Sequence, residues 1–456
     1  MSRPVVVERR TPIATTAGAL WRWHAAPGAF ERLRPPWEQV EILARSGDAL
    51  TDGLQVTLRL RRGPIALRWV LRHEAVEPGV GFDDVQVRGP FATWHHAHRF
   101  RDHPDGALLD DTITATFPGG SLGRAIGAPI LARQLDRMFR YRHDVTRHDL
   151  EQQMTTPLAP MRIAITGASG MVGTALTPFL TAQGHTVVPV SRRALPGGIR
   201  WDPEAGVIRA ADFEGLDAVI HLAGENIAAA RWTAARKEAL RHSRIGPTQL
   251  LAQTLAGLTQ PPRVLLSVSA IGIYGDRGDE ALTEQSSLAG DFLGQLGQAW
   301  EAAAAPAAAA GIRVVHPRFG IILTPEGGAL AKMLPTARLG LGGPLGGGRQ
   351  WMSWIALDDV LGAIHHLLAH DEIAGAVNTV APTAVRNGDF ATTLGQVLSR
   401  PAFLPVPAVA LKLLFGEMAE ETLLASTHVR PDVLTASDYQ FRYPALEPAL
   451  RHLLGH

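Results

Sequence analysis

The chain has 456 residues, more than one hydrophobic core usually organises, so two or three domains are expected. Its formal net charge is +1 and no run of lysine or arginine stands out, so nucleic acid is not an expected partner. The chain has no cysteine, which excludes a disulfide scaffold, a thiolate metal site and a thiol nucleophile.

Two features of the chain bear on its location. The first ten residues carry charges where a signal peptide would need an apolar core. The most apolar later run, 403–415, is interrupted by prolines and a lysine and is too short to span a bilayer. We therefore expect a cytoplasmic protein with no membrane span.

Residues 1–150 contain no nucleotide-binding motif and form the first expected domain. Apolar and polar residues alternate over 54–60 and 66–71, which is typical of antiparallel strands with one solvent-facing side. The segment 123–150 instead has apolar residues at helical spacing. Further elements are expected as a short helix at 17–23 and strands at 82–87, 93–100 and 109–117. A curved antiparallel sheet with a long final helix would enclose an apolar cavity.

Four short motifs in this region resemble one known domain. They are 21–24 (Trp-Arg-Trp-His), 30–38, 89–96 and 138–143. Together they are similar to the SRPBCC domain, also called START-like or polyketide-cyclase-like. The resemblance implies an α+β helix-grip fold that holds a hydrophobic ligand or a partner, and it implies no particular reaction.

Three histidines, His95, His96 and His98, lie close together in the expected strand 93–100. Alternate residues of a strand face opposite sides, so at most His96 and His98 could reach one metal without help from elsewhere. We therefore predict no metal site and interpret these side chains as hydrogen-bonded structural histidines.

The second half of the chain opens after a linker. Residues 151–160 are polar and then proline-marked, as at a domain boundary. From 161 to 383 expected strands alternate with expected helices, which predicts an α/β domain with a doubly wound parallel sheet.

The first strand of this domain leads into a glycine-rich turn. Gly167, Gly170 and Gly173 have the spacing G-x-x-G-x-x-G between an apolar strand and a helix. In a Rossmann domain such glycines permit a sharp turn, close approach of backbone N–H groups to a pyrophosphate, and close packing of the helix. The cofactor-binding residues predicted here are Thr166, Gly167, Ser169, Gly170, Met171, Val172 and Gly173.

The identity of the cofactor is indicated by the end of the next strand. An acidic residue there would bind the ribose hydroxyls of NAD, but the sequence reads Ser191-Arg192-Arg193. Two arginines suit a 2′-phosphate by charge and by bidentate geometry. The sequence therefore predicts NADP(H) in preference to NAD(H), bound in part by Ser191, Arg192 and Arg193.

Later motifs resemble the extended short-chain dehydrogenase/reductases. The turn Leu222-Ala223-Gly224 is similar to one that lies against the adenine and ribose in that superfamily. A further segment contains Ser269 and ends in Tyr274-Gly275, like the superfamily's serine-containing segment. The motifs 231–233, 342–360 and 400–407 narrow the resemblance to the NAD(P)-dependent epimerase-like family, over residues 161–456. It implies a Rossmann fold, a small C-terminal cap domain at 384–456 and, as is common in the superfamily, a homodimer.

One feature of that superfamily is missing. Its usual chemistry needs a tyrosine and a lysine four residues later, so that a phenolate can exchange a proton during hydride transfer. None of the four tyrosines has a lysine four residues after it, and the helix expected over 291–301 contains neither residue type. We take Ser269 as the first candidate for a substrate contact and Tyr274 as a candidate phenol. Either Arg318, which we also predict to bind the cofactor, or the cofactor itself would supply the positive charge. Asp276 and Glu284 are further candidates for the acid/base group, and ordinary packing, turn and capping roles remain open for all of them.

Two functions follow from these motifs. The first is an NADP(H)-dependent reductase, dehydrogenase or epimerase acting on a small molecule, with the N-terminal domain holding an apolar substrate. The second is a protein that binds NADP(H) and a hydrophobic ligand without chemistry, as the missing dyad suggests.

Overall fold

The computed structural model describes residues 3–47 and 49–456. The chain divides into two compact units. Unit 1 comprises Met1–Pro157, Thr181–Gly184 and Gly455, and unit 2 comprises Leu158–Leu180, His185–Leu454 and His456. None of the described helices combines the length and the apolar character that crossing a lipid bilayer requires.

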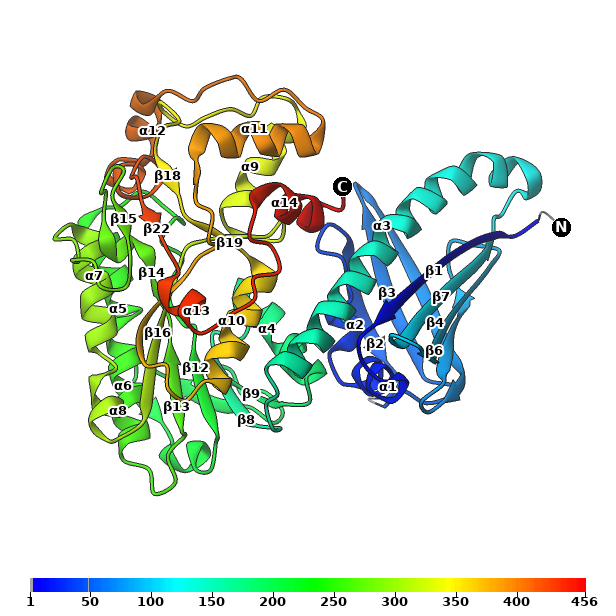
Figure 1. Ribbon diagram of the computed structural model, residues 1–456, viewed down its shortest axis with the longest axis horizontal. Coiled ribbons are helices and arrows are strands. Elements are labelled where there is room, and N and C mark those ends of the chain that lie inside the picture. The colour runs from blue at the N-terminus through cyan, green and yellow to red at the C-terminus, as the bar shows by residue number, and fades with distance from the viewer. Residues whose placement is uncertain (1–2, 48) are drawn as a thin grey trace. The chain divides into compact units, whose positions relative to one another are not determined.

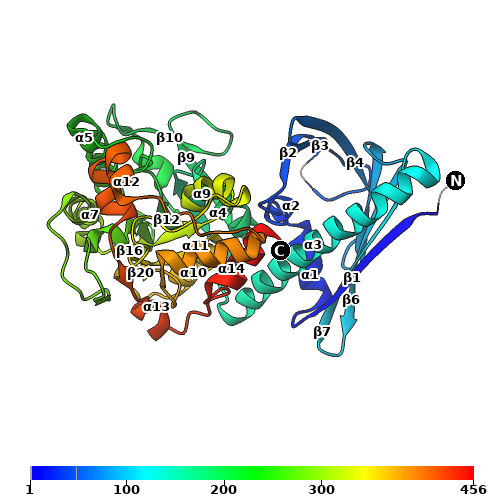
Figure 2. The same ribbon diagram turned by 90° about the horizontal axis from the view of Figure 1, so that it is seen from above.

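Unit 1 is a curved antiparallel sheet with one long helix running along one side of it (Figures 1 and 2). The strand order is β1-β7-β6-β5-β4-β3-β2. The strands are β1 (Val5–Ile13), β2 (Gln39–Arg45), β3 (Gln55–Arg62), β4 (Ile65–Glu77), β5 (Gly81–Arg88), β6 (Thr93–His103) and β7 (Gly106–Thr116), and the helices are α1 (Ala17–Ala25), α2 (Ala29–Arg32) and α3 (Gly120–Thr155). The predicted helix-grip architecture is confirmed, although the sequence analysis missed β1 and β2.

The inner face of this sheet is built by strict alternation. Every second residue of β6 is buried, from Trp94 to Phe100, and these side chains point to the same side. The helix α3 is held by a buried ion pair in which Arg32 donates two hydrogen bonds of 2.9 Å to the carboxylate of Asp149. This bidentate ion pair joins the last part of α3 to α2, in addition to the apolar packing around it.

Unit 2 contains a nine-stranded sheet that is parallel through its centre. Its order is β11-β10-β9-β8-β12-β13-β16-β14, and β20 also pairs with β16. The strands are β8 (Arg162–Thr166), β9 (Thr186–Ser191), β10 (Ile199–Asp202), β11 (Val207–Ile208), β12 (Ala218–His221), β13 (Val264–Ser267), β14 (Ser269–Ala270), β16 (Arg313–Phe319) and β20 (Gly375–Thr379). The chain leaves β8 toward β9 on one side, and β12 then pairs on the other side, so strand order reverses between β8 and β12. Ligands of open α/β sheets bind at the carboxyl ends of strands at such a point.

Helices cover both faces of this sheet, as Figure 1 shows. The helices are α4 (Met171–Ala182), α5 (Ala234–His242), α6 (Ile245–Ala256), α7 (Phe292–Ala302), α8 (Ala305–Ala309), α9 (Gly328–Arg338) and α10 (Leu357–Ala369), with short 3₁₀ turns η1 (Ala210–Phe213) and η2 (Ile271–Tyr274). Successive residues of β8 face opposite layers: Ile163 and Ile165 pack with α4 and α10, whereas Ala164 packs with α6 and α8. The doubly wound sheet predicted from the sequence is confirmed.

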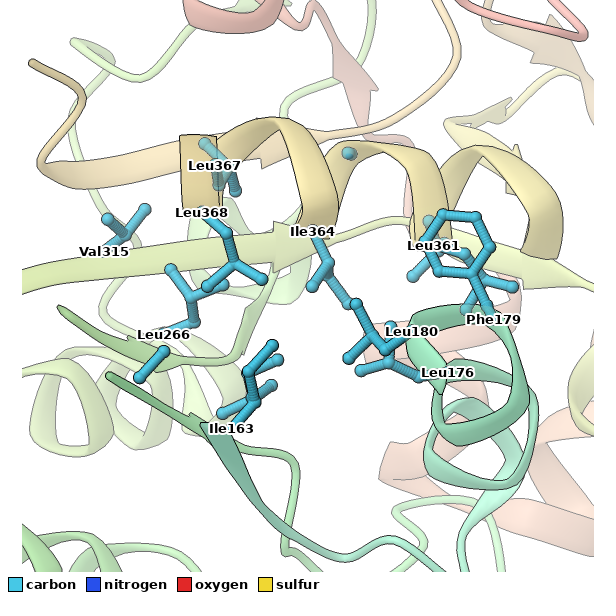
Figure 3. Packing of buried hydrophobic residues seen from close by; sticks show 14 of the residues in the cluster. Ile163, Leu176, Phe179, Leu180, Leu266, Val315, Leu361, Ile364, Leu367 and Leu368 are labelled. Carbon is cyan, nitrogen blue, oxygen red and sulfur yellow. The ribbon is translucent and has the colours of Figure 1, made fainter. Parts of the chain in front are cut away.

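The layer that contains α4 and α10 forms the largest part of the core (Figure 3). Leu176, Phe179 and Leu180 recur at helical spacing on α4 and have no exposed surface. They face strand residues such as Ile163, together with Ile364 of α10, in the same cluster. Each fully buried side chain of this size contributes about 1.5–3 kcal/mol to stability, so this layer holds α4 against the sheet.

The C-terminal part of unit 2 adds short elements to this frame. They are α11 (Asn387–Leu398), α12 (Ala408–Phe415), η3 (Ala419–Leu423), α13 (Asp432–Ala436) and α14 (Leu446–Leu454), with the two-stranded pairs β15 (Ala281–Leu282) and β22 (His428–Val429), β17 (Ile321–Leu323) and β19 (Trp354–Ala356), and β18 (Trp351–Met352) and β21 (Val385–Arg386). The helix α12 ends at Phe415 because Gly416 has a φ of 61°, a backbone conformation outside the helix.

Candidate functional site

The glycine-rich turn joins β8 to α4 and leaves no room for side chains at two positions. Gly167 has a φ of 69°, and a Cβ atom there would lie 2.9 Å from the carbonyl carbon of Leu222. A Cβ atom at Gly173 would lie 2.4 Å from the carbonyl oxygen of Gly167. The first glycine is therefore required by backbone conformation and the second by the close approach of α4 to the turn.

The open side of this turn suits an anion. Ser169 and Gly170 are exposed, and α4 begins at the next residue, Met171. The first N–H groups of a helix have no partner within the helix, and the helix dipole favours negative charge near them. The N–H of Gly170 donates a 2.9 Å hydrogen bond to the carbonyl oxygen of Gly167, so binding of a pyrophosphate here would use the neighbouring N–H groups, and it stays a prediction.

Substitution of Gly173 tests this geometry. We expect Gly173→Ala to push α4 away from the turn and to weaken NADPH binding at least tenfold, because the new Cβ atom would meet backbone rather than a flexible side chain. Isothermal titration with NADPH measures the effect. Gly246→Ala, at the start of α6, is the control, because its Cβ atom would meet nothing within 4 Å. Equal affinity of Gly173→Ala and the unchanged protein would mean that the cofactor does not use this turn.

The two predicted phosphate-binding arginines follow β9, the neighbour of β8. Both side chains are exposed, and that of Arg192 is 72% exposed. A guanidinium nitrogen of Arg192 lies 3.9 Å from a carboxylate oxygen of Glu204. The hydroxyl of Ser191 accepts a 3.2 Å hydrogen bond from the backbone N–H of Arg193, which shapes the turn. Both guanidinium groups therefore lie near the carboxyl end of β9. The 3.9 Å contact of Arg192 with Glu204 is too long for a hydrogen bond.

A buried hydrogen-bonded chain ties β8 to β12 at the switch point. The Thr166 hydroxyl is 2.7 Å from Nδ1 of His221 and accepts a 3.3 Å hydrogen bond from the N–H of Ala223. Nε2 of His221 is 2.9 Å from the Thr248 hydroxyl of α6. Burial lowers the pKa of His221 to about 4, so this imidazole is neutral at pH 7.

This chain of hydroxyls and imidazole holds the turn at 222–224 in place. Leu222 and Ala223 are half-buried and Gly224 is exposed, at the carboxyl end of β12 beside the glycine turn. The hydroxyl of Thr166 contacts His221 and is not directed at the cofactor site. Thr166 could therefore affect cofactor binding only through its place at the start of the glycine turn. Sequence reasoning missed His221, and the signal that could have found it is a lone histidine at the end of an apolar strand.

A second buried network lies at the carboxyl ends of β14 and β16. The guanidinium of Arg318 donates two 2.8 Å hydrogen bonds to the carboxylate of Glu301 on α7. Its third nitrogen donates a 2.7 Å hydrogen bond to the hydroxyl of Tyr274. That hydroxyl donates in turn to Oδ1 of Asn378 at 2.7 Å. Although burial acts to raise it, the pKa of Glu301 is held below its ordinary value by Arg318 and next by the hydroxyl of Ser269.

This network gives the three predicted residues different surroundings. Ser269 is 2% exposed and lies beside the carboxylate of Glu301. Tyr274 has no exposed surface, its hydroxyl both accepts and donates, and burial raises its pKa. Arg318 is 4% exposed and is engaged by Glu301 and Tyr274. The roles assigned to these residues from the sequence stay predictions. Of the three, Ser269 is the one whose polar side-chain atom has no well-formed hydrogen bond among the described residues.

The two carboxylates considered as acid/base groups have structural partners. Oε1 of Glu284 accepts hydrogen bonds from the backbone N–H groups of Asn378 and Val433, at 3.0 and 3.2 Å. The second of these groups lies in the first turn of α13, so Glu284 caps that helix. Oδ1 of Asp276 accepts from Gly278 and Ser426 and stabilises a turn.

Helix α7, which was expected to lack the tyrosine and lysine, packs directly on η2. A Cβ atom at Gly297 would lie 2.8 Å from the side chain of Ile273, and a Cβ atom at Gly272 would lie 3.0 Å from Leu293. Leu293 and Gly297 are four residues apart and therefore share this face of the helix. The face is filled by apolar contacts and carries no titratable group at either position.

Unit 1 contains a cavity of about 670 Å³ between its sheet and helices. Its walls are mostly apolar and include Leu58, Leu71, Trp94 and Met138. Arginine, glutamate and glutamine side chains also line it, and one group of polar side chains consists of His24, His73, Asp84, His96 and His98. The volume is that of a site for a small organic molecule, as the helix-grip resemblance implied.

The histidines of β6 divide between the two faces of the sheet as the strand period predicts. His96 and His98 face the cavity and are 3% and 5% exposed. His95 lies on the other face, where its Nε2 is 2.8 Å from the carboxylate of Asp83. Although burial opposes the charged form, Asp111 and then Asp84 raise the pKa of His98 to about 9.

Three protein families match separate parts of the chain. Residues 163–379 match the NAD dependent epimerase/dehydratase family, residues 13–139 the polyketide cyclase / dehydrase and lipid transport family, and residues 406–453 a domain of unknown function. Epimerase family protein Mb2239 of Mycobacterium bovis is 40% identical over 290 residues, covering 63% of this chain and 96% of the relative. Epimerase family protein SDR39U1 of Homo sapiens is 38% identical over 302 residues, covering 65% of this chain and all of the relative.

Two crystal structures extend this similarity to the fold. A nucleoside-diphosphate sugar epimerase from Corynebacterium glutamicum superposes with a TM-score of 0.81 at 34% identity, covering 98% of this chain and 90% of the other. Human epimerase family protein SDR39U1 (isoform 2), crystallised with NADPH, superposes with a TM-score of 0.60 at 36% identity, covering 64% of this chain and 99% of the other. The first of these matches spans both units of the chain.

Proposed function

Because this chain belongs to the epimerase family of the SDR39U1 type, we propose that it binds NADP(H) and uses it in a reductase or epimerase reaction on a small molecule. The observation that carries the proposal is the glycine turn at the start of α4, with Arg192 and Arg193 exposed after the neighbouring strand. The human relative crystallised with NADPH supports the same choice of cofactor.

Different residues of this chain bind different parts of the cofactor. Backbone N–H groups from Ser169 to Val172 bind the pyrophosphate, and Arg192 and Arg193 bind the 2′-phosphate. The turn 222–224 borders the adenine and ribose. When bound, the cofactor supplies hydride exchange at its nicotinamide ring.

Ser269 is the residue that we propose to contact the substrate. It begins the short strand β14, just beyond the carboxyl end of the central strand β13, and ligands of open α/β sheets bind at this edge. The Glu301 carboxylate beside it is fixed by two hydrogen bonds from Arg318, so the Ser269 hydroxyl has an oriented acceptor. Through that acceptor the network can orient the hydroxyl toward an oxygen of the substrate.

Turnover tests the catalytic part of the proposal. The protein saturated with NADPH is mixed with pools of carbonyl compounds, and absorbance at the nicotinamide band is followed; the protein saturated with NADP⁺ is mixed with pools of nucleotide sugars, and new epimers are separated by chromatography, because an epimerase returns the hydride and leaves the absorbance unchanged. We expect turnover in at least one pool, and we expect Ser269→Ala to slow it about 100-fold, which lies within the range for a positioned proton-transfer contact. Tyr274→Phe keeps the ring, and a comparable loss in that variant would transfer the role to Tyr274.

The second function, binding without chemistry, is favoured by one specific observation. The face of α7 that contacts η2 is filled by Leu293 and Gly297 and offers no acid or base. Under this alternative NADPH still binds, and no pool is reduced or epimerised. In either case we propose that an apolar ligand occupies the cavity of unit 1, because most of the side chains that line its interior are apolar.

A further inference from the structure

The polar patch in the cavity of unit 1 is assembled across three strands. His73 of β4 is directly opposite Asp84 of β5, and Asp84 is directly opposite His96 of β6. Residues that are directly opposite share a face of the sheet, and His98 shares that face because it lies two residues after His96. The pairing of β5 with β6 therefore places the carboxylate of Asp84 beside His96 and His98, and β6 contributes no carboxylate at this point.

Three of these side chains converge on one point. One ligand atom from each of Asp84, His96 and His98 lies within 4.8 Å of the other two. Oδ2 of Asp84 is 3.5 Å from Nε2 of His98. Ligand atoms bound at about 2.0–2.2 Å to one tetrahedral ion are separated by roughly 3.4 Å, so this spacing fits with small side-chain adjustments.

One of the three converging groups lacks a hydrogen-bond partner. His96 is 3% exposed, and its Nε2 makes no hydrogen bond among the residues that the structure describes. The nearest recorded carboxylate oxygen, Oδ1 of Asp111, is 3.6 Å away. A buried imidazole nitrogen without a partner is costly, and a ligand at this point would satisfy it.

The outer groups that metal-binding side chains require are also in place. Nδ1 of His98 is 2.7 Å from Oδ1 of Asp111, which leaves Nε2 directed at Asp84. The other oxygen of Asp111 is 3.0 Å from Nε2 of His143, whose Nδ1 is 2.8 Å from the Thr11 hydroxyl. A carboxylate behind a ligating histidine fixes its tautomer and orientation.

Asp84 is oriented in the same way by a neighbour. Its Oδ1 lies 2.6 Å from Nδ1 of His73, so the other oxygen faces His98. Two carboxylates, that of half-buried Asp84 and that of buried Asp111, stand within this cluster. Neutral imidazole ligands would leave their two negative charges to be balanced by a divalent cation.

We propose that Asp84, His96 and His98 bind a divalent transition metal ion at the side of the unit 1 cavity. Two imidazoles and one carboxylate are ligands that suit Zn²⁺ and Fe²⁺, and three protein ligands leave coordination positions open. These positions face the cavity, so a mostly apolar molecule with a carbonyl, hydroxyl or carboxylate oxygen could complete the coordination. The site lies within unit 1 and is independent of the NADP(H) function proposed for unit 2.

Zinc titration of the full chain tests the site. After dialysis against EDTA and removal of the chelator, calorimetric titration with ZnCl₂ is expected to give one site per chain with a Kd of about 1 μM or below. Asp84→Asn and His96→Gln should each weaken this binding at least tenfold. His95→Gln is the matched control, because His95 lies on the same strand and faces away from the cavity. The chain has 18 histidines, so weak binding at other stoichiometries is expected to be common to all four proteins.

A second measurement needs no variant, so it tests the site even if the substituted proteins fail to fold. X-ray absorption at the zinc edge, on the unchanged protein loaded with one equivalent, should show nitrogen and oxygen ligands with two imidazoles. The proposal is overturned by the absence of a stoichiometric site, by unchanged binding in a folded Asp84→Asn, or by a spectrum without imidazole. In those cases His98 serves as a protonated partner of the two carboxylates. NADPH titration of the same samples separates this result from the proposed function of unit 2.

Discussion

Replacing Arg192 and Arg193 together by alanine is expected to weaken NADPH binding about 100-fold and to change NADH binding by less than about threefold. Hydrogen bonds to charged groups contribute about 1.5–3 kcal/mol each, and exposure of these side chains reduces that value. A loss near 2.7 kcal/mol corresponds to the 100-fold change. Calorimetric titration of the double variant with each cofactor measures both affinities.

The control for this experiment is an arginine at the other end of the sheet. Arg162 begins β8, at the amino end of the strand, and its side chain is exposed. Arg162→Ala should leave the affinities for NADPH and NADH unchanged. If the double variant keeps its preference for NADPH, the 2′-phosphate is recognised elsewhere and the interpretation of 191–193 is wrong.

Glu301→Ala is expected to lower the free energy of unfolding by about 3–5 kcal/mol. The substitution leaves the guanidinium of Arg318 buried without its carboxylate, and removing one partner of a buried ion pair has an effect of this size. Each 1 kcal/mol shifts the melting temperature of a large domain by about 2–4 °C, so Tm should fall by about 10 °C. Differential scanning calorimetry measures this shift.

An exposed pair provides the comparison. Glu447 and Arg451 form a pair on the surface of α14 whose side chains are 52% and 48% exposed. Glu447→Ala should change stability by about 0.5 kcal/mol or less, because solvent screens such pairs. A similar small effect in Glu301→Ala would mean that solvent reaches Arg318 freely in solution.

The effect of Glu301 should also depend on pH in a defined direction. Its pKa in the folded protein lies below the ordinary glutamate value of about 4.3. The stabilisation is therefore complete above that value and is lost as pH falls through the lower, folded pKa. The difference in Tm between the unchanged protein and Glu301→Ala should be constant near neutral pH and shrink below about pH 4.

The parts of the fold that the sequence predicted depend on local patterns. The glycine spacing around Gly167 and the apolar run before it specify strand, turn and helix within a dozen residues, and the structure confirms them. The alternation in β6 likewise predicted that His96 and His98 share a face. These inferences need only the backbone period and a conformation that glycine alone adopts easily.

The parts that the sequence did not predict depend on pairings between distant residues. Asp84 joins His96 and His98 only through the register of β5 against β6, which no local pattern specifies. The network of Glu301, Arg318 and Tyr274 joins α7, β16 and η2. The orientation of the Tyr274 side chain depends on how η2 packs against these elements. The sequence therefore predicted that Tyr274 lies near Ser269 but could not predict which groups its hydroxyl contacts.

The tight contact between α7 and η2 also constrains how this chain could change in evolution. A phenol and an ammonium four residues apart on this face would have to replace Leu293 and Gly297. Any side chain at the second position would collide with Ile273, since even a Cβ atom would lie 2.8 Å from it. Leu293→Tyr combined with Gly297→Lys would therefore require η2 to move before the lysine side chain could fit. The packing of α7 on η2 leaves no room for such a pair at these two positions.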